Sequence, residues 1–222
     1  MKNFVELKKV NYKYEKTGFE ISDVSLKLNK GECAILRGSN GSGKTTLGKL
    51  IMGIIKPDSG SVYVGGQDIR KNKLYENAKN ISYLFQNPDR HFFCTTAKEE
   101  IEFSLLHNGN SEDEADKKAT ELLERFNMAD KADSFPLKLS GGEKQRLALL
   151  TVFAVNPSYY ILDEPSSGID ADIKNSLIDM LIQIKQTGSG LLIITHDKTM
   201  TNQLADRVIT MSGGKAAGDE TT

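Results

Sequence analysis

The sequence predicts an α/β fold with a mostly parallel sheet, an added antiparallel β part and an inserted helical lobe. Short apolar strand-like runs alternate with helical segments, which is typical of a parallel sheet covered by helices. A glycine-rich run separates one such strand from a helix, and a charged helical stretch interrupts the alternation. The 222 residues suit a single domain over 1–222, and we place the inserted lobe at 95–138.

The first half of the chain contains strand-like segments rich in Val, Ile, Leu and Tyr, bounded by polar turns. The expected strands are Val5–Tyr14, Ile21–Leu28, Cys33–Leu36 and Ile81–Phe85. The third is a short apolar run, as expected for a buried parallel strand. Helical periodicity runs from Thr45 to Ile55, and the turn residues of 56–60 are expected to end that helix.

The second half begins with the helical lobe and then returns to the α/β pattern. Within the lobe, Ser111 and Glu114 form a predicted capping box for a helix over 112–126. The polar tail 213–222 is expected to fray. The remaining expected elements are a helix over 142–155, a strand at 159–162, a helix burying Ile173, Leu177, Leu181 and Ile184, and strands at 190–195 and 207–211.

Composition predicts a soluble globular protein. Lys and Arg total 29 against 30 Asp and Glu, so the formal net charge of -1 gives no bulk reason to bind nucleic acid. Cys33 and Cys94 are expected to be unpaired thiols. The N-terminal residues lack the apolar run of a signal peptide, and no apolar run approaches the roughly 20 residues that span a bilayer. Any membrane role is therefore expected to depend on a partner.

A phosphate-binding loop is predicted between the strand at 33–36 and the helix at 45–55. Residues 38–45 match G-x-x-x-x-G-K-[ST] at every fixed position. Backbone N–H groups of such a loop point at phosphate oxygens, Lys44 can reach the β- and γ-phosphates, and the Thr45 hydroxyl can ligate Mg²⁺. The expected ATP-binding residues here are Gly38, Ser39, Asn40, Gly41, Ser42, Gly43, Lys44, Thr45 and Thr46.

Two carboxylates end the apolar strand at 159–162. Parallel strands deliver their C-terminal residues to one edge of a sheet, so Asp163 and Glu164 are expected at the edge that carries the phosphate loop. Asp163 would hold Mg²⁺ directly or through water, and Glu164 would polarise the attacking water as a general base or its orienter. The sequence therefore predicts hydrolysis of a nucleotide with Mg²⁺, and the family resemblance carried by the next motif implies that this nucleotide is ATP.

The octet Leu139–Arg146 (LSGGEKQR) narrows the class of nucleotide-binding protein that the sequence predicts. Its Ser-Gly-Gly at a helix start offers a hydroxyl and backbone N–H groups to an anion. The octet resembles the signature motif of ABC-type ATPases, and with the two preceding motifs it extends the resemblance over about 5–215. The resemblance implies a P-loop NTPase core and a head-to-tail dimer. Each nucleotide would then meet the phosphate loop of one subunit and Ser140, Gly141, Gly142 and Asp170 of the other.

The same resemblance assigns further residues. Tyr14 stands at the position of the aromatic residue that stacks on adenine, and Gln86 stands at the position of the Q-loop glutamine, a further Mg²⁺ ligand. His196 resembles the switch histidine that contacts the γ-phosphate, so the expected catalytic residues are Glu164, His196 and Lys44. His91 and His107 lack metal-ligand spacing.

The run Phe85–Asp89 (FQNPD) resembles the Q-loop of energy-coupling-factor importer ATPases, although His91 stands where a glutamine is usual. This resemblance implies a transmembrane partner bound through the Gln86 loop, a second ATPase subunit that is identical or similar, and a peripheral location on the cytoplasmic membrane face. The cargo would be a vitamin or a transition-metal ion.

Two alternatives remain open. One is the ATPase of another ABC importer or exporter. The other is a chromosome-maintenance or DNA-repair ATPase with a similar signature motif, but such chains need long coiled coils, and only about 50 residues separate Gln86 from Ser140.

Overall fold

The computed structural model describes residues 3–221, and the chain divides into two compact units. Met1, Lys2 and Thr222 lie outside the described residues, so the two ends of the expected domain 1–222 are not covered. Of the described residues, the first unit comprises 3–83, 157–163 and 182–221. The second comprises Leu84–Asn156 and Glu164–Leu181.

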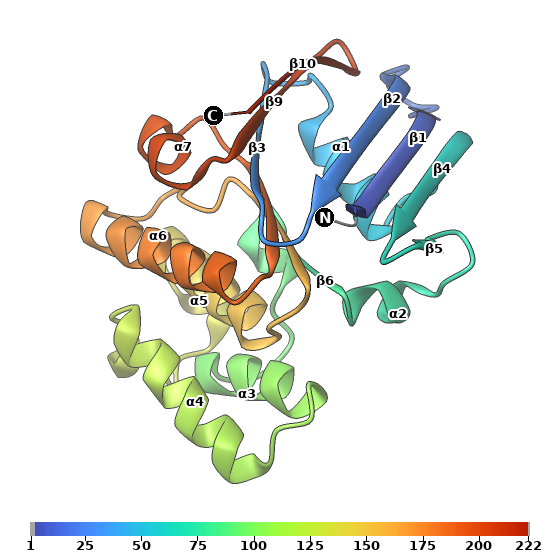
Figure 1. The fold of residues 1–222 in the computed structure, drawn as a ribbon. Coiled ribbons are helices and arrows are strands. Elements are labelled where there is room, and N and C mark those ends of the chain that lie inside the picture. Colours follow the sequence, from blue (N-terminus) through green and yellow to red (C-terminus); the bar gives the residue numbers. More distant parts are fainter. Residues whose placement is uncertain (1–2, 222) are drawn as a thin grey trace. The chain divides into compact units, whose positions relative to one another are not determined.

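The first unit contains an antiparallel sheet with strand order β2-β1-β4-β5 (Figure 1). β1 and β2 pair through most of their length, and β4 adds to the other side of β1. Residues of β2 alternate between buried and more exposed positions, which is the period-2 pattern of a strand with one buried face. The strands are β1 (Asn3–Lys13), β2 (Glu20–Asn29), β4 (Ser59–Val64) and β5 (Gln67–Asp68).

The first unit also contains a six-stranded sheet with order β10-β9-β3-β8-β7-β6, except for the last residue of β6, Leu84, which belongs to the second unit. β9, β3, β8 and β7 are parallel neighbours, and β10 pairs antiparallel with β9. β7 and β8 are buried along their whole length, as expected for central strands covered on both faces. The strands are β3 (Cys33–Arg37), β6 (Ile81–Leu84), β7 (Tyr159–Asp163), β8 (Gly190–Ile194), β9 (Arg207–Ser212) and β10 (Lys215–Thr221).

Three helices belong wholly to the first unit: α1 (Lys44–Met52), α2 (Leu74–Ala78) and α7 (Lys198–Leu204). α1 contacts β4 of the antiparallel sheet and β7 of the parallel sheet. It ends before Gly53, which has a left-handed backbone at φ 83° and donates its N–H to the last turn. This glycine stops the helix before the turn residues 56–60, to which the sequence assigned that role.

The second unit is mostly helical. α3, α4 and α5 pack on one another, and each begins with a capping box, in which a Ser or Thr and a Glu three residues later bond to each other's backbone N–H. The elements are η1 (Pro88–Arg90), α3 (Ala97–His107), α4 (Glu112–Arg125), η2 (Ala129–Lys131), η3 (Pro136–Lys138) and α5 (Gly141–Ala154); α6 (Ala171–Gln186) begins here and continues into the first unit.

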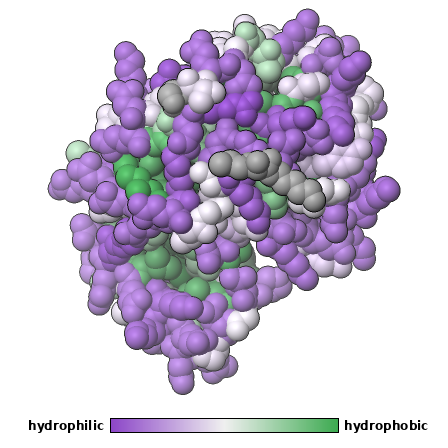
Figure 2. Space-filling model, viewed as in Figure 1, coloured by the Kyte–Doolittle hydropathy of each residue, from purple (hydrophilic) through white to green (hydrophobic). Residues whose placement is uncertain are grey.

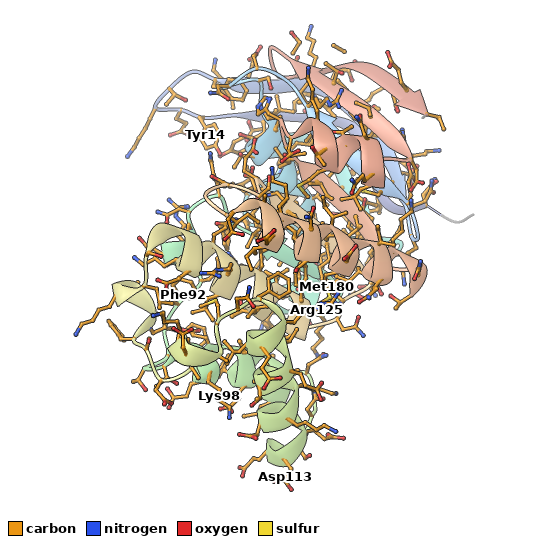
Figure 3. All side chains as sticks on the ribbon, turned by 90° about the vertical axis from the view of Figure 1, so that its left-hand side faces the viewer. Tyr14, Phe92, Lys98, Asp113, Arg125 and Met180 are labelled. Carbon is orange, nitrogen blue, oxygen red and sulfur yellow. The ribbon has the colours of Figure 1, made fainter. Side chains whose placement is uncertain are left out.

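Two helices of this unit are joined by an ion pair. Lys98 on α3 has its Nζ 2.5 Å from the Asp116 carboxylate on α4, and Asp113 marks the N-terminal turn of α4 (Figure 3). The helices expected in the lobe are therefore present, including the capping box at Ser111. That 95–138 forms a lobe of its own remains a proposal.

The expected strands and long helices are confirmed, with shifts of a few residues at their ends. The expectation of a fraying tail is wrong, because 215–221 form β10, an edge strand paired with β9. Its residue Asp219 accepts hydrogen bonds from the Arg207 guanidinium of β9. A polar tail is ordered when such contacts hold it. The sequence analysis also missed β4, β5, α2 and α7.

Candidate functional site

The glycine-rich run forms a tight turn between β3 and α1. Gly38 has φ 150°, and a Cβ at this position would lie 2.3 Å from the carbonyl oxygen of Met211, so only glycine fits there. Gly43 precedes α1 with a left-handed backbone at φ 107° and has no side chain to cap the helix. The first N–H groups of α1 are therefore not bonded by a capping side chain, and a helix N-terminus of this kind suits a phosphate.

The lysine of the loop is held by the loop's own backbone. Lys44 is 8 % exposed, and its Nζ donates to the carbonyl oxygens of Gly38 at 2.7 Å and Ser39 at 3.0 Å. The Ser42 hydroxyl is buried and has no hydrogen-bond partner among the described residues. A buried polar group of this kind indicates a site built for a further polar partner.

The strand-end aspartate is bonded to the loop. The Thr45 hydroxyl donates to Asp163 Oδ2 at 2.7 Å, and the Tyr83 hydroxyl lies 3.5 Å from the same oxygen. Burial raises the pKa of the Asp163 carboxyl, while the Thr45 and Tyr83 hydroxyls oppose that shift. The sequence therefore correctly placed Thr45 and Asp163 together, although 118 positions separate them.

A hydroxyl and a carboxylate are oxygen ligands of the kind that Mg²⁺ prefers. Mg²⁺ commonly binds one or two carboxylates together with substrate phosphates and water, so a three-carboxylate cage is not required. The described residues contain no group of three or more His, Cys, Asp or Glu side chains that could hold a metal ion. Thr45 and Asp163 nevertheless fit a nucleotide-bound Mg²⁺.

His196 lies close to the start of the phosphate loop. It follows β8 and is exposed, and the turn after it is held by the Thr195 hydroxyl, which accepts the Asp197 N–H at 3.0 Å. The histidine and the start of the loop line the same cavity, which has a volume of about 570 Å³. Arg37 and Lys198 place positive charge on its walls. The cavity is lined by Arg37, Gly38, Ser39, His196, Lys198 and Asn202.

Tyr14 follows the end of β1 and belongs to the first unit (Figure 3). Its ring packs edge-on against Tyr12 with centroids 4.9 Å apart, and its backbone N–H bonds to the Phe19 carbonyl. The side chain is only partly buried, so one part of the ring remains open to solvent. This partial exposure is compatible with stacking of the ring on a nucleotide base.

The Gln86 loop lies in the second unit and is fastened by its own side chains. Gln86 is exposed, and the Asn87 side chain accepts the Asp89 N–H at 3.0 Å at the start of η1. His91 Nε2 accepts the Phe85 N–H at 3.0 Å, and burial lowers the pKa of this histidine to about 4. The loop is therefore held in one shape while Gln86 itself stays accessible.

The Ser-Gly-Gly turn also lies in the second unit, at the start of α5. Ser140 Oγ accepts the Glu143 N–H at 3.4 Å, and Glu143 accepts the Ser140 N–H at 2.8 Å. The pKa of the Glu143 carboxyl lies below its usual value, mainly because of the hydrogen bond with the Ser140 side chain. Ser140 and Gly141 are exposed, so a neighbouring molecule can reach the turn.

Glu164 and Asp170 lie in the second unit as well. Glu164 has a left-handed backbone at φ 53°, which is uncommon for a residue other than glycine. Asp170 is exposed, and its carboxylate caps α6 by accepting the Ile173 N–H at 3.0 Å, which lowers its pKa. The first unit thus brings together the phosphate loop, Asp163 and His196, and the second holds Gln86, the signature turn, Glu164 and Asp170.

Sequence reasoning missed two side chains that contact these residues. Tyr83 reaches Asp163 from β6, and nothing in the local sequence distinguishes it from an ordinary strand aromatic. Gln145 lies inside the octet that carried the resemblance, but no role was assigned to it. Its amide nitrogen lies 3.3 Å from the carbonyl oxygens of Glu164 and Pro165.

Comparison with known families gives a match to the ABC transporter model over residues 21–167, which is more than half of the chain. The chain belongs to the ABC transporter family. It is an ATP-binding and ATP-hydrolysing subunit of the ABC type, and the resemblance drawn from the sequence is confirmed. The α/β P-loop NTPase fold is confirmed as well.

Two relatives illustrate the similarity within the ABC family. A putative ABC transporter ATP-binding protein of Pyrococcus furiosus is 37% identical over 95% of this chain and 81% of its own length. The energy-coupling factor transporter ATP-binding protein EcfA1 of Staphylococcus aureus is 37% identical over 95% of this chain and 78% of its own.

Solved ABC structures have the same fold. The dimeric cassette MJ0796, bound to ADP and Pi, matches with a TM-score of 0.88 and 27% identity over 98% of both chains. CbiO1 of Clostridium perfringens, described as part of the ABC transporter complex cbiONQ, matches with a TM-score of 0.82 and 26% identity over 100% of this chain and 89% of its own. Among the described residues of this ABC subunit, none of the helices has the length and apolar character needed to cross a bilayer.

Proposed function

We propose that this chain is the ATPase that energises an energy-coupling-factor type importer of a vitamin or a transition-metal ion. The observation that carries the ATPase part is the 2.7 Å bond between the Thr45 hydroxyl and Asp163, because it joins the phosphate loop to a carboxylate that suits Mg²⁺. The importer part is supported by the FQNPD run at 85–89 and by relatives named as energy-coupling factor ATPases.

The proposed catalytic roles follow from the chemistry of each group. Lys44 neutralises charge on the β- and γ-phosphates, and His196 contacts the γ-phosphate. Thr45, Asp163 and Gln86 hold Mg²⁺, which supplies positive charge to the transferring phosphoryl group. Glu164 directs the attacking water as a general base or its orienter.

Binding of the nucleotide base and of the second subunit completes the proposal. Tyr14 stacks on adenine, and the phosphates bind the N–H groups of 38–46. The turn Ser140–Gly142, which is exposed at its first two residues, and Asp170 contact the nucleotide of a neighbouring ATPase subunit, which is a second copy or a similar chain. ATP then joins the two subunits, and hydrolysis releases them.

Two substitutions test the ATPase assignment. Lys44→Ala should weaken ATP binding by at least about tenfold, since a charge-assisted phosphate contact contributes about 1.5–3 kcal/mol. Lys49→Ala, on the same helix, is the control and should bind ATP normally. Glu164→Gln should bind ATP normally but lose turnover, whereas Asp179→Asn on α6 should not. Unchanged affinity in Lys44→Ala would remove the phosphate loop from the account, and normal hydrolysis in Glu164→Gln would remove Glu164 from the catalytic role.

The membrane partner is proposed to dock on the second unit beside Gln86. Phe93 and Phe103 are 67% and 50% exposed, and their rings pack edge-on with centroids 4.7 Å apart. Exposed aromatic pairs of this kind are common at protein interfaces. The face drawn in Figure 2 is mainly hydrophilic, with a few hydrophobic patches. Docking to such a partner would place the chain on the cytoplasmic face of the membrane.

Copurification from native membranes tests this docking site. The wild-type chain should bring down a polytopic membrane protein, and Phe103→Ser should lose most of it. Tyr75→Ser is the matched control, because Tyr75 is an exposed aromatic residue of the first unit, 57% exposed. Equal capture by both variants would contradict the site. Stimulation of the ATPase by DNA would favour the DNA-repair alternative instead.

A further inference from the structure

The side chain of Gln145 is buried against the backbone that follows β7. Gln145 lies in the second turn of α5 and is 3 % exposed. Its Nε2 donates to the carbonyl oxygens of Glu164 and Pro165, each at 3.3 Å. The two hydrogen bonds connect α5, which begins at the Ser140 turn, with the peptide groups that directly follow Glu164 and Pro165.

The backbone at Glu164 needs such support. Its φ of 53° is in the left-handed region, where the β-carbon of a residue other than glycine crowds the backbone and the conformation is strained. Strained conformations persist when the surrounding structure holds them in place. The Glu164 carbonyl also accepts the Ser167 N–H at 3.1 Å, so the oxygen is held both by its own turn and by Gln145.

A second contact holds the same segment against the start of α5. A Cβ added to Gly142 would lie 2.7 Å from the Gly168 carbonyl oxygen, so the two backbones approach as closely as glycine allows. Glu164 is thus part of a segment whose two ends, at 164–165 and at 168, both contact the first turns of α5. The direction of its carboxylate depends on this packing, because the backbone dihedrals at a residue fix the direction of its Cα–Cβ bond.

We propose that Gln145 is a positioning residue for hydrolysis, which holds the strained backbone of Glu164 so that its carboxylate is aimed at the attacking water. This inference rests on the proposed catalytic role of Glu164. It also means that the helix which presents Ser140 to a neighbouring subunit supports the carboxylate of its own chain. Movement of α5 would therefore change the position of Glu164.

Two variants remove the donor while keeping the size of the side chain. Gln145→Leu and Gln145→Met are uncharged replacements of similar volume that have no hydrogen-bond donor. Both should lower kcat for ATP about 10- to 100-fold, the scale expected when a catalytic group is displaced by about 1 Å. ATP affinity, measured by equilibrium binding, should stay within about twofold, because the phosphates bind residues 38–46.

A matched control separates this role from general damage to the helix. Thr151 is a buried polar residue of α5 whose hydroxyl donates to the Ala148 carbonyl of the same helix. Thr151→Val should leave kcat unchanged. Hydrogen exchange gives a readout without catalysis: the peptide covering 164–168 should exchange faster in the Gln145 variants and not in Thr151→Val. Should both full-size variants melt far below the wild type, Gln145→Asn, which keeps a shorter amide, should give an intermediate kcat.

The double variant Gln145→Met/Glu164→Gln distinguishes the possible failures. If Gln145 acts through Glu164, the double variant should be no slower than Glu164→Gln alone. A double variant whose loss of kcat is the product of the two single losses would overturn this inference alone. So would folded Gln145 variants with normal kcat and normal exchange while Glu164→Gln is inactive. Normal hydrolysis by Glu164→Gln would instead overturn the proposed catalytic role on which it rests.

Discussion

Acid should destabilise this protein through His91. Its Nε2 accepts the Phe85 N–H at 3.0 Å, and its ring lies against Phe85 with centroids 5.2 Å apart. Protonation would replace the acceptor by a donor and place a charge in a largely buried position. Burial lowers the pKa of His91 from 6.5 to about 4.

The size of the effect follows from that difference. Between the two pKa values the unfolded chain binds a proton that the folded chain excludes, so stability rises with pH in this range. The contribution is complete above pH 6.5 and is lost as the pH falls toward about 4. At about 1.4 kcal/mol per pKa unit the full loss is about 3 kcal/mol, of which about 2 kcal/mol is lost at about pH 5.

Thermal unfolding of the wild type and of His91→Gln measures this contribution. A glutamine carbonyl can accept the same N–H but does not titrate. Between about pH 7.5 and about pH 5 the wild type should lose about 4–8 °C more in Tm than the variant, since 1 kcal/mol corresponds to about 2–4 °C for a chain of this size. His91→Leu should be less stable by about 1–3 kcal/mol at neutral pH, because the Phe85 N–H loses its partner. Parallel losses of Tm in the wild type and His91→Gln would refute the reasoning.

Three further effects on stability follow. The Tyr159 hydroxyl is buried without a hydrogen-bond partner among the described residues, so Tyr159→Phe should leave the free energy of unfolding unchanged or raise it by about 1 kcal/mol; a clear loss in denaturant unfolding would show a missed partner. Lys144 Nζ lies 2.9 Å from the Asp89 carboxylate, and a double-mutant cycle should give at most about 1 kcal/mol of coupling that salt reduces; coupling insensitive to salt would contradict a solvent-screened pair. Ser140→Ala should cost about 0.5–2 kcal/mol through the lost cap of α5, whereas Ser140→Asn should keep most of it; equal losses in the two variants would argue against capping.

The phosphate loop was predictable because its geometry is local. Glycines that adopt positive φ, a lysine and a hydroxyl follow one another between a strand and a helix, so Gly38, Gly43 and Lys44 could be placed from the sequence. The Thr45–Asp163 contact is distant in sequence, but it follows from a general rule that parallel strands end at one edge of a sheet. Capping boxes were readable for the same local reason, as at Ser111.

Other parts depend on contacts that no short segment encodes. β10 looks like a polar tail, and its order comes from pairing with β9 and from the Arg207–Asp219 ion pair. The Tyr83 hydroxyl meets Asp163 from a strand 80 positions away, and the amide of Gln145 reaches Glu164 from another helix. Side chains that act on the backbone of a distant segment carry no pattern of their own. Contacts of this kind exist only in the folded chain, where the two distant segments lie together.

The mass of the Glu164→Gln protein in solution tests the central claim most directly, namely that ATP joins the phosphate loop of one subunit to the Ser140 turn of another. Light scattering after size exclusion should show a dimer with ATP and Mg²⁺ and a monomer with ADP. Adding Ser140→Arg should prevent the dimer while ATP still binds. A Glu164→Gln protein that binds ATP and yet stays monomeric, or a dimer that Ser140→Arg leaves intact, would contradict the account.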